Sequence, residues 1–268
     1  MTYRQPAFMV DNAIGDITDV GDVRAAPSTS AISTETIRAL VDGRISSIGT
    51  FTATGSNAGL RYDLPVVPPV ELNRMVIPAT HSGFNGETLQ IFHDNAVGFP
   101  SATTASSAVV SGEGTIDRVL DSGTEQFWAM QVSTSVNLDV FTLRGLWLGV
   151  YNQLSSAAAV DPKFELGWES QQTETDYPGG TAVAQISAPR RTFTLEIADV
   201  DPAGADYTLL DAVMQARTKP FWYWPPDDTD PGPFYVRHSR DPSRVQDFGA
   251  PSLATRYTFK FGFLEDNL

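Results

Sequence analysis

Short runs that alternate between apolar and polar residues recur along the whole chain. Leu72 to Ile77 and Thr88 to Phe92 alternate in the first half, and Thr192 to Ile197 and Tyr257 to Phe263 alternate in the second half. A period of two over runs this short indicates β-strands with two different faces. The sequence therefore predicts a mainly β protein.

The chain is predicted to divide into two β-domains joined by a polar connector. In the strand from 72 to 77, the alternation places Asn73, Met75 and Ile77 on one face. Pro78 to Gly86 is rich in residues that accept turn dihedrals, so we expect a loop there. Asn152 to Ala159 is polar and rich in alanine. We place the domain boundary in this connector, with domains at 1–152 and 160–268 and an irregular arm at the N-terminus.

One helix is predicted in the second domain. Asp201 and Pro202 supply an N-cap and a proline at the first helical position. Arg217 and Lys219 complement the dipole at the C-terminus of that helix. The apolar residues at helical spacing between these ends are Tyr207, Leu210, Val213 and Met214. A shorter helical stretch is expected at Ser33 to Leu40.

Aromatic residues follow directly after this helix. A strand over Phe221 to Trp224 cannot turn all four rings toward one core, so two rings point to the opposite face. That face is either covered by the chain itself or is an interaction surface. The candidate assembly surface consists of Phe221, Trp222, Tyr223, Trp224 and Tyr235. Trp128 and Trp147 lie in apolar strands and are expected in the core rather than as sugar-stacking platforms.

Composition narrows the class of function. The chain has 268 residues, of which 41% are hydrophobic and 10% aromatic, so it is expected to be globular. A formal charge of −14 disfavours a phosphate-backbone partner, so we expect no nucleic-acid binding. There is no cysteine, no apolar run long enough for a membrane span, and no secretory pattern at Met1 to Pro6. We therefore expect a soluble protein made in a cytoplasm.

Residues typical of catalysis are sparse. The three histidines are far apart and lack the spacing of a zinc site, and we expect them to be solvated loop or cap residues: His81, His93 and His238. No glycine-rich phosphate loop or nucleophile elbow is present, so no catalytic residue and no cofactor is assigned. Acids at 11, 16, 19 and 22 lack calcium-loop spacing. Asp227, Asp228 and Asp230 are interpreted as a charged hairpin tip rather than as a metal site.

Five short segments follow one another in the first 150 residues: Leu40 to Arg44, Leu60 to Pro65, Leu72 to Ile77, Gly86 to Phe92, and a closing strand at Phe141 to Gly149. In this order they resemble the galactose-binding-like fold, the jelly-roll β-sandwich of discoidin-type and carbohydrate-binding modules. The resemblance implies a jelly-roll-type β-sandwich. A glycan site in such a module would use tip loops, here His81, Phe84, Asn85 and Asn95.

Residues 160–268 contain a fixed order of features: Arg190 to Leu195, a helix, Lys219 to Pro225, Tyr235 to Arg237, and an aromatic last strand ending at Asp266. This order resembles minor tail or tail-tip proteins of tailed bacteriophages. The resemblance implies a second β-sandwich or barrel with one flanking helix. It also implies assembly into rings within a virion tail.

These observations lead to one principal hypothesis and two alternatives. The principal hypothesis is a non-enzymatic structural component of a phage tail or tail tip, forming a trimer or hexamer and contacting other tail proteins. The first alternative is a carbohydrate-binding module or receptor-binding protein that attaches to host-surface glycans. A glycoside hydrolase is the second alternative, although the abundance of acids is no argument for it, because 32 acids always offer some pair of carboxylates.

Overall fold

The computed structural model describes residues 5–13, 23–25, 48–64, 71–79, 81–96, 99–134, 139–155, 163–169, 172–176, 182–186, 189–217, 219–226, 232–247 and 255–266. These residues are mainly β and include one helix, which confirms the predicted class. The chain forms two compact units. Unit 1 contains Met1–Val10 and Asn152–Asn267, and unit 2 contains Asp11–Tyr151 together with Leu268. The helix predicted at Ser33 to Leu40 lies outside the described residues.

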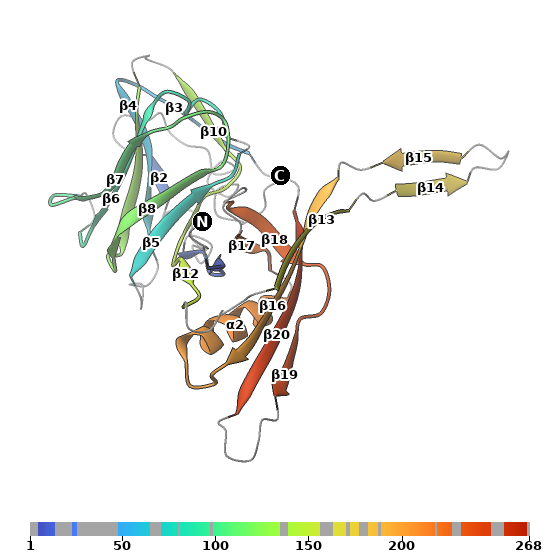
Figure 1. Cartoon of the computed structure of the whole chain (residues 1–268). Helices are drawn as coiled ribbons and strands as arrows, with labels where there is room; N and C mark the ends of the chain where they lie inside the picture. Colours follow the sequence, from blue (N-terminus) through green and yellow to red (C-terminus); the bar gives the residue numbers. More distant parts are fainter. Residues whose placement is uncertain are drawn as a thin grey trace. The chain divides into compact units, whose positions relative to one another are not determined.

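Unit 2 is built from three sheets around one apolar core (Figure 1). The largest sheet has the order β2 (Val23–Ala25), β4 (Asn57–Asp63), β9 (Phe127–Ser133), β6 (Thr88–Asp94) and β7 (Thr103–Val109). A three-stranded sheet has the order β11 (Trp147–Gly149), β5 (Leu72–Ile77) and β8 (Ile116–Gly123). A third sheet pairs β10 (Val140–Leu143) with β3 (Gly49–Thr52). The strand β6 shows how alternation builds the core, because its residues Leu89 and Ile91 are buried while Thr88 and Gln90 are half-buried.

The strand β5 departs from the predicted facing of its side chains. Its pairing with β8 shifts register between Leu72 and Arg74, which is the signature of a β-bulge. Leu72, Met75 and Ile77 therefore belong to the apolar core, whereas Asn73 does not. The prediction that Asn73, Met75 and Ile77 share a face is wrong for Asn73, because β8 carries two extra residues opposite this part of β5 and the regular register begins only at Arg74.

Unit 1 contains an eight-stranded sheet (Figure 1). Its order is β12 (Asn152–Gln153), β1 (Ala7–Met9), β17 (Phe221–Trp224), β18 (Phe234–His238), β20 (Arg256–Glu265), β16 (Arg190–Val200) and β13 (Lys163–Glu169). The remaining strand, β19 (Ser243–Asp247), pairs with the first half of β20. A separate ribbon pairs β14 (Gln172–Asp176) with β15 (Ala182–Ile186). Where the sequence suggested a sandwich or barrel, the described strands form this single sheet and the ribbon.

The first strand of the chain belongs to unit 1. Ala7, Phe8 and Met9 are buried and pair with Trp224, Tyr223 and Trp222 of β17. Phe8 stacks on Tyr223 with ring centroids 5.3 Å apart. The N-terminal segment was predicted to be an irregular arm of the first domain, and residues 5–10 differ from that prediction because Phe8 completes the other unit's core.

Helix α2 (Ala205–Gln215) begins and ends inside the predicted boundaries. Its N-cap is Gly204 rather than Asp201, whose side chain instead accepts a hydrogen bond from the N–H of Ala203 at 3.0 Å in the preceding turn. No basic residue lies in the last turn, so the predicted dipole interaction is absent. The predicted apolar spacing is confirmed, because Leu210 and Val213 are buried against the sheet.

His238 links the helix to the aromatic core of unit 1. Its Nε2 lies 2.9 Å from the carbonyl oxygen of Val213, and its ring lies 5.4 Å from that of Phe263. The histidine is half-buried rather than solvated, which corrects the prediction. Burial lowers the pKa of His238 below its ordinary value. The hydrogen bond to Val213 and the nearby Asp241 raise this pKa, Arg217 lowers it, and burial has the largest effect.

We expect unit 1 to lose stability as the pH falls below about 6.5, the ordinary histidine pKa. The unfolded chain binds a proton on residue 238 at a higher pH than the folded chain does, so acid favours unfolding. The melting temperature of the wild type should therefore fall more steeply between pH 7.5 and pH 5.5 than that of His238→Gln, measured by calorimetry. Equal slopes for the two proteins would contradict this assignment.

Candidate binding site

The predicted tip loop does not expose an aromatic ring. Phe84 is completely buried, and its ring packs at 5.2 Å from the ring of Phe141. His81 is buried too, with Nε2 at 2.8 Å from the carbonyl oxygen of Gly114. Asn85 is exposed, but its Oδ1 accepts the N–H of Gly112 at 2.8 Å. The proposed glycan role of His81 and Phe84 is therefore corrected, because a buried ring cannot stack on a sugar.

The predicted assembly surface is also buried. The side chains of Phe221, Trp222, Tyr223 and Trp224 are at most 1% exposed, and Tyr235 is 4% exposed. Phe221 and Tyr223 belong to the core of unit 1, and Trp222 packs on Tyr235 with ring centroids 5.1 Å apart. These five residues are therefore not an exposed assembly surface. The predicted core positions of Trp128 and Trp147 are confirmed, since both are buried.

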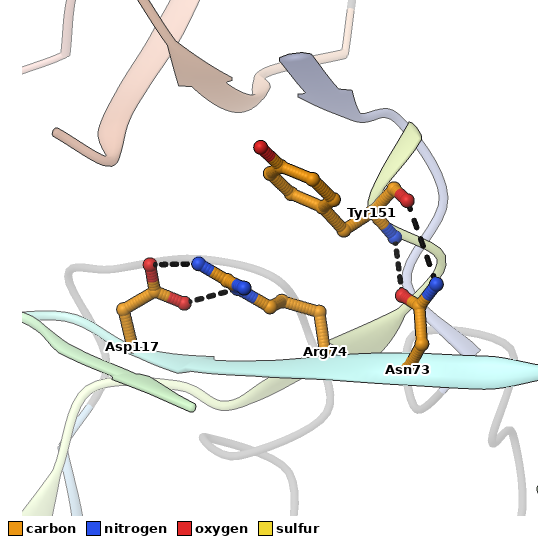
Figure 2. A network of polar contacts seen from close by, with 4 residues as sticks. All are labelled: Asn73, Arg74, Asp117 and Tyr151. Atoms are coloured by element: carbon orange, nitrogen blue, oxygen red, sulfur yellow. Dashed lines mark hydrogen bonds and ion pairs between the residues drawn. The ribbon is translucent and has the colours of Figure 1, made fainter. Parts of the chain in front are cut away.

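A network of polar contacts joins β5 to Asp117 of β8 and to the backbone of Tyr151 (Figure 2). The Oδ1 atom of Asn73 accepts the N–H of Tyr151 at 2.7 Å, and the Nδ2 atom donates to the carbonyl oxygen of Tyr151 at 3.5 Å. Beside it, Arg74 forms two hydrogen bonds to the carboxylate of Asp117, at 2.5 and 2.6 Å. The guanidinium also lies 4.7 Å from the centre of the Tyr151 ring. Asn73 and Arg74 thus both contact Tyr151, so this network has a structural role.

A buried histidine lies on the core side of the five-stranded sheet. The register places His93 opposite Trp128, with ring centroids 4.9 Å apart. Its Nδ1 lies 2.9 Å from Oε2 of Glu125, a contact without hydrogen-bond geometry. A Cβ at Gly123 would require the carboxylate of Glu125 to move and would crowd the His93 ring. His93 is 5% exposed, which corrects the prediction of a solvated histidine.

The loop after β6 is held by a single carboxylate. Asp94 accepts the N–H of Ala96 at 3.1 Å on one oxygen and the N–H of Ser101 at 2.8 Å on the other. The N–H of Phe99 donates to the carbonyl oxygen of Ala96 at 3.2 Å. These bonds fix both ends of the loop, as an aspartate side chain commonly does in turns.

Phe99 and Arg61 lie together at this loop. The guanidinium of Arg61, on β4, lies 5.0 Å from the centre of the half-exposed Phe99 ring. Two of its nitrogens, Nε and Nη2, are buried without a hydrogen-bond partner among the described residues. Phe99 has a φ of 56°, a left-handed conformation that is costly for a bulky residue. Backbone strain of this kind is concentrated at functional positions.

The loop that carries Phe99 also carries Asn95, which is exposed. Asn95 was predicted from the sequence as glycan-facing, whereas Arg61, Asp94 and Phe99 were not. A strained backbone and a long-range cation–π contact leave no pattern in the sequence. Together, Arg61, Asn95 and Phe99 offer a ring face, a cation and an amide, a combination suited to a polyhydroxylated ligand.

Other chemistry has little structural support in the described part of the chain. No three acidic or histidine side chains there are grouped to hold a metal ion. The hairpin acids at 227, 228 and 230, and those at 16, 19 and 22, lie outside the described residues. No helix in the described ranges is long and apolar enough to cross a bilayer.

Comparison with known proteins finds similarity in structure but not in sequence. The sequence matches no family model and no curated protein. Chitosan-binding module 1 of a chitosanase/glucanase from Paenibacillus sp. IK-5 matches with a TM-score of 0.41 at 16% identity, covering 52% of this chain and 99% of that one. CBM32-5 of CpGH89 from Clostridium perfringens, solved with GalNAc-β-1,3-galactose, matches with a TM-score of 0.38 at 10% identity, covering 49% of this chain and 97% of that one.

A third solved structure is of the same kind. It is the CBM32 of AlyQ in complex with 4,5-unsaturated mannuronic acid, with a TM-score of 0.35 at 17% identity, covering 48% of this chain and 95% of that one. All three of these similar structures are carbohydrate-binding modules. At these scores the similarity carries no argument about the ligand of this chain.

Asp117→Ala should destabilise unit 2 by about 2 kcal/mol, because it removes the carboxylate from a mostly buried arginine. The side chains of Arg74 and Asp117 are only 13% and 18% exposed. Asp121→Ala is the matched control, since Asp121 is an exposed acid on the same strand and should change stability by less than about 0.5 kcal/mol. Urea unfolding measures both values. Equal losses for the two variants would show that the ion pair contributes nothing specific.

Proposed function

We propose that the protein is a non-enzymatic binding protein whose unit 2 recognises carbohydrate. The observation that carries the proposal is the strained, half-exposed Phe99 ring with the Arg61 guanidinium against it. Sugars bind proteins through the stacking of a ring face on an aromatic side chain and through hydrogen bonds to hydroxyl groups. Phe99 supplies the face and the exposed Asn95 supplies an amide, while Arg61, whose Nε and Nη2 are buried, lies against the ring.

The position of this site supports the same proposal. Asp94 is 7% exposed and accepts hydrogen bonds from the N–H groups of Ala96 and Ser101, so the backbone at these two residues is held before a ligand arrives. A preorganised loop on a rigid sheet loses little conformational entropy on binding. The proposed ligand class is a polysaccharide of a microbial cell surface, as expected for a receptor-binding protein.

Phe99→Ala should weaken glycan binding about tenfold or more, because it removes the only described ring of this loop. Binding would be measured on an array of microbial polysaccharides, followed by titration calorimetry on the glycans that bind. Trp168→Ala is the control, since Trp168 is a 62% exposed aromatic residue in the other unit. The proposal fails if no glycan binds the wild type or if Phe99→Ala binds as well as Trp168→Ala.

A second candidate function is assembly into a larger structure, such as a phage tail, with copies of the chain or with neighbouring tail proteins. One specific observation favours it. The edge strand β13 exposes Leu166 and Trp168, which are 40% and 62% accessible. Exposed apolar residues on a sheet edge are a common basis for pairing with another chain. In this candidate the protein is made in a bacterial cytoplasm and resides in the virion.

The assembly candidate predicts that the purified protein is larger than a single chain. Light scattering after size exclusion, over a concentration series, should give a whole multiple of the chain mass, with a trimer or hexamer expected for a ring. A single-chain mass at every concentration would contradict self-assembly.

A further inference from the structure

The strand β13 is an open edge of the eight-stranded sheet. It pairs with β16 over Lys163 to Glu169 without a register shift and pairs with no other described strand. Its outer backbone N–H and C=O groups therefore have no ladder partner among the described strands. Natural edges are usually protected by a proline, a bulge or charged side chains. The strand β13 has neither a proline nor a bulge, and Glu165 and Glu169 lie on the face opposite Leu166 and Trp168.

The exposed side chains of this edge extend the apolar face of unit 1. Leu166 pairs with Phe193, and Trp168 pairs with Arg191, so they lie on the face that carries the core. The guanidinium of Arg191 lies 5.3 Å from the Trp168 ring. Glu165 has the opposite facing, because side chains alternate along a strand. The edge is therefore apolar on one face.

The sequence of β13 is self-complementary in one antiparallel register. When two copies pair with Leu166 at the centre, each residue i faces residue 332 − i of the other copy. Basic then faces acidic and aromatic faces aromatic, and no two like charges are opposite. The facing pairs are Lys163 with Glu169, Phe164 with Trp168, Glu165 with Gly167, and Leu166 with Leu166.

Other pairings of the same strands are less favourable. A parallel, in-register pair would place Glu165 beside Glu165 and Glu169 beside Glu169, and like charges opposite each other are destabilising. The strand β19 has no described partner besides β20, but its only exposed large apolar residue is Val245. Charge and apolar complementarity therefore both single out β13.

We propose that two copies of this chain associate through antiparallel pairing of β13 with β13, centred on Leu166. The contact is isologous, so each copy presents the same edge to the other. It continues the eight-stranded sheet of one copy into that of the second. The inference deepens the assembly candidate, on which it rests, and is independent of glycan binding. It favours an even number of copies.

Cysteine cross-linking tests the register directly, because the natural chain contains no cysteine. In Leu166→Cys the two Cα atoms would lie about 4.5–5.5 Å apart, within the range that a disulfide spans. In Glu169→Cys the two thiols would be six residues out of register, roughly 20 Å apart. Mild oxidation should therefore produce a disulfide dimer rapidly from Leu166→Cys and not from Glu169→Cys.

The control for random collision is Val119→Cys, at a 67% exposed apolar position of unit 2. Cross-linking of Val119→Cys or Glu169→Cys at the rate of Leu166→Cys would overturn the proposed register. Both cysteine positions on β13 are exposed, so neither substitution disturbs the core.

Light scattering provides a second, independent test. Leu166→Lys places two lysines opposite each other at the centre of the contact, and it should raise the dissociation constant of the dimer about tenfold or more. Val119→Lys should leave the dissociation constant unchanged. If Leu166→Lys assembles as the wild type does, assembly stands and the β13 pairing fails. If the wild type has the mass of one chain at all concentrations, both fail.

Discussion

The ladder of apolar side chains between β16 and β20 is the contact on which unit 1 depends. The register pairs Phe193 with Phe263, Leu195 with Phe261 and Ile197 with Phe259, and all six side chains are buried. Full burial of one such side chain stabilises by about 1.5–3 kcal/mol, so this ladder outweighs the surface ion pairs of the unit. The helix, β1 and β17 add their apolar residues to this cluster.

The ladder also determines where polar residues are tolerated in unit 1. Thr192, Thr194 and Glu196 occupy the alternate positions of β16, where they are half-buried. His238 borders the aromatic cluster, and its lowered pKa keeps it neutral at pH 7 while it contacts Val213. The burial of Phe8 in the same cluster requires the N-terminal strand to join the sheet beside β17.

In unit 2, polar side chains fix the ends of strands whose middles are fixed by apolar packing. Asp94 holds the loop that follows β6, and Asn73 holds the backbone at Tyr151. Both side chains replace backbone groups as hydrogen-bond partners, which irregular segments require. The candidate glycan site lies on such a segment because a loop can present a strained ring such as Phe99, whereas a regular strand cannot.

Period-two alternation predicted the strands well because alternate burial is a local consequence of a sheet. It located β5, the apolar face of β16 and the aromatic face of β20. Alternation failed at Asn73, because a bulge depends on the partner strand β8. It also could not show that Phe84 turns inward onto Phe51 and Phe141, a packing that joins segments far apart in the sequence.

The same limit explains the candidate sites. The contact between Arg61 and Phe99 joins β4 to a loop 38 positions later, so no local motif marks it. The aromatic run at 221–224 was correctly expected to face two ways, but its four rings are buried in the folded chain. The position of β13 at the edge of the sheet follows only from the strand order, which no local pattern shows.

Net charge and the edge strand act together in the proposed assembly. Each copy carries a formal charge of −14, so two copies that approach at random repel each other. That repulsion is screened over about 8–10 Å at moderate salt, whereas residues paired across a sheet edge are closer than this. A contact that sets Lys163 opposite Glu169 adds attraction at short range. The repulsion between the net charges of the two copies is the same for every register, so it does not select one. The acidic surface thus opposes indiscriminate aggregation of an apolar edge while permitting one complementary register.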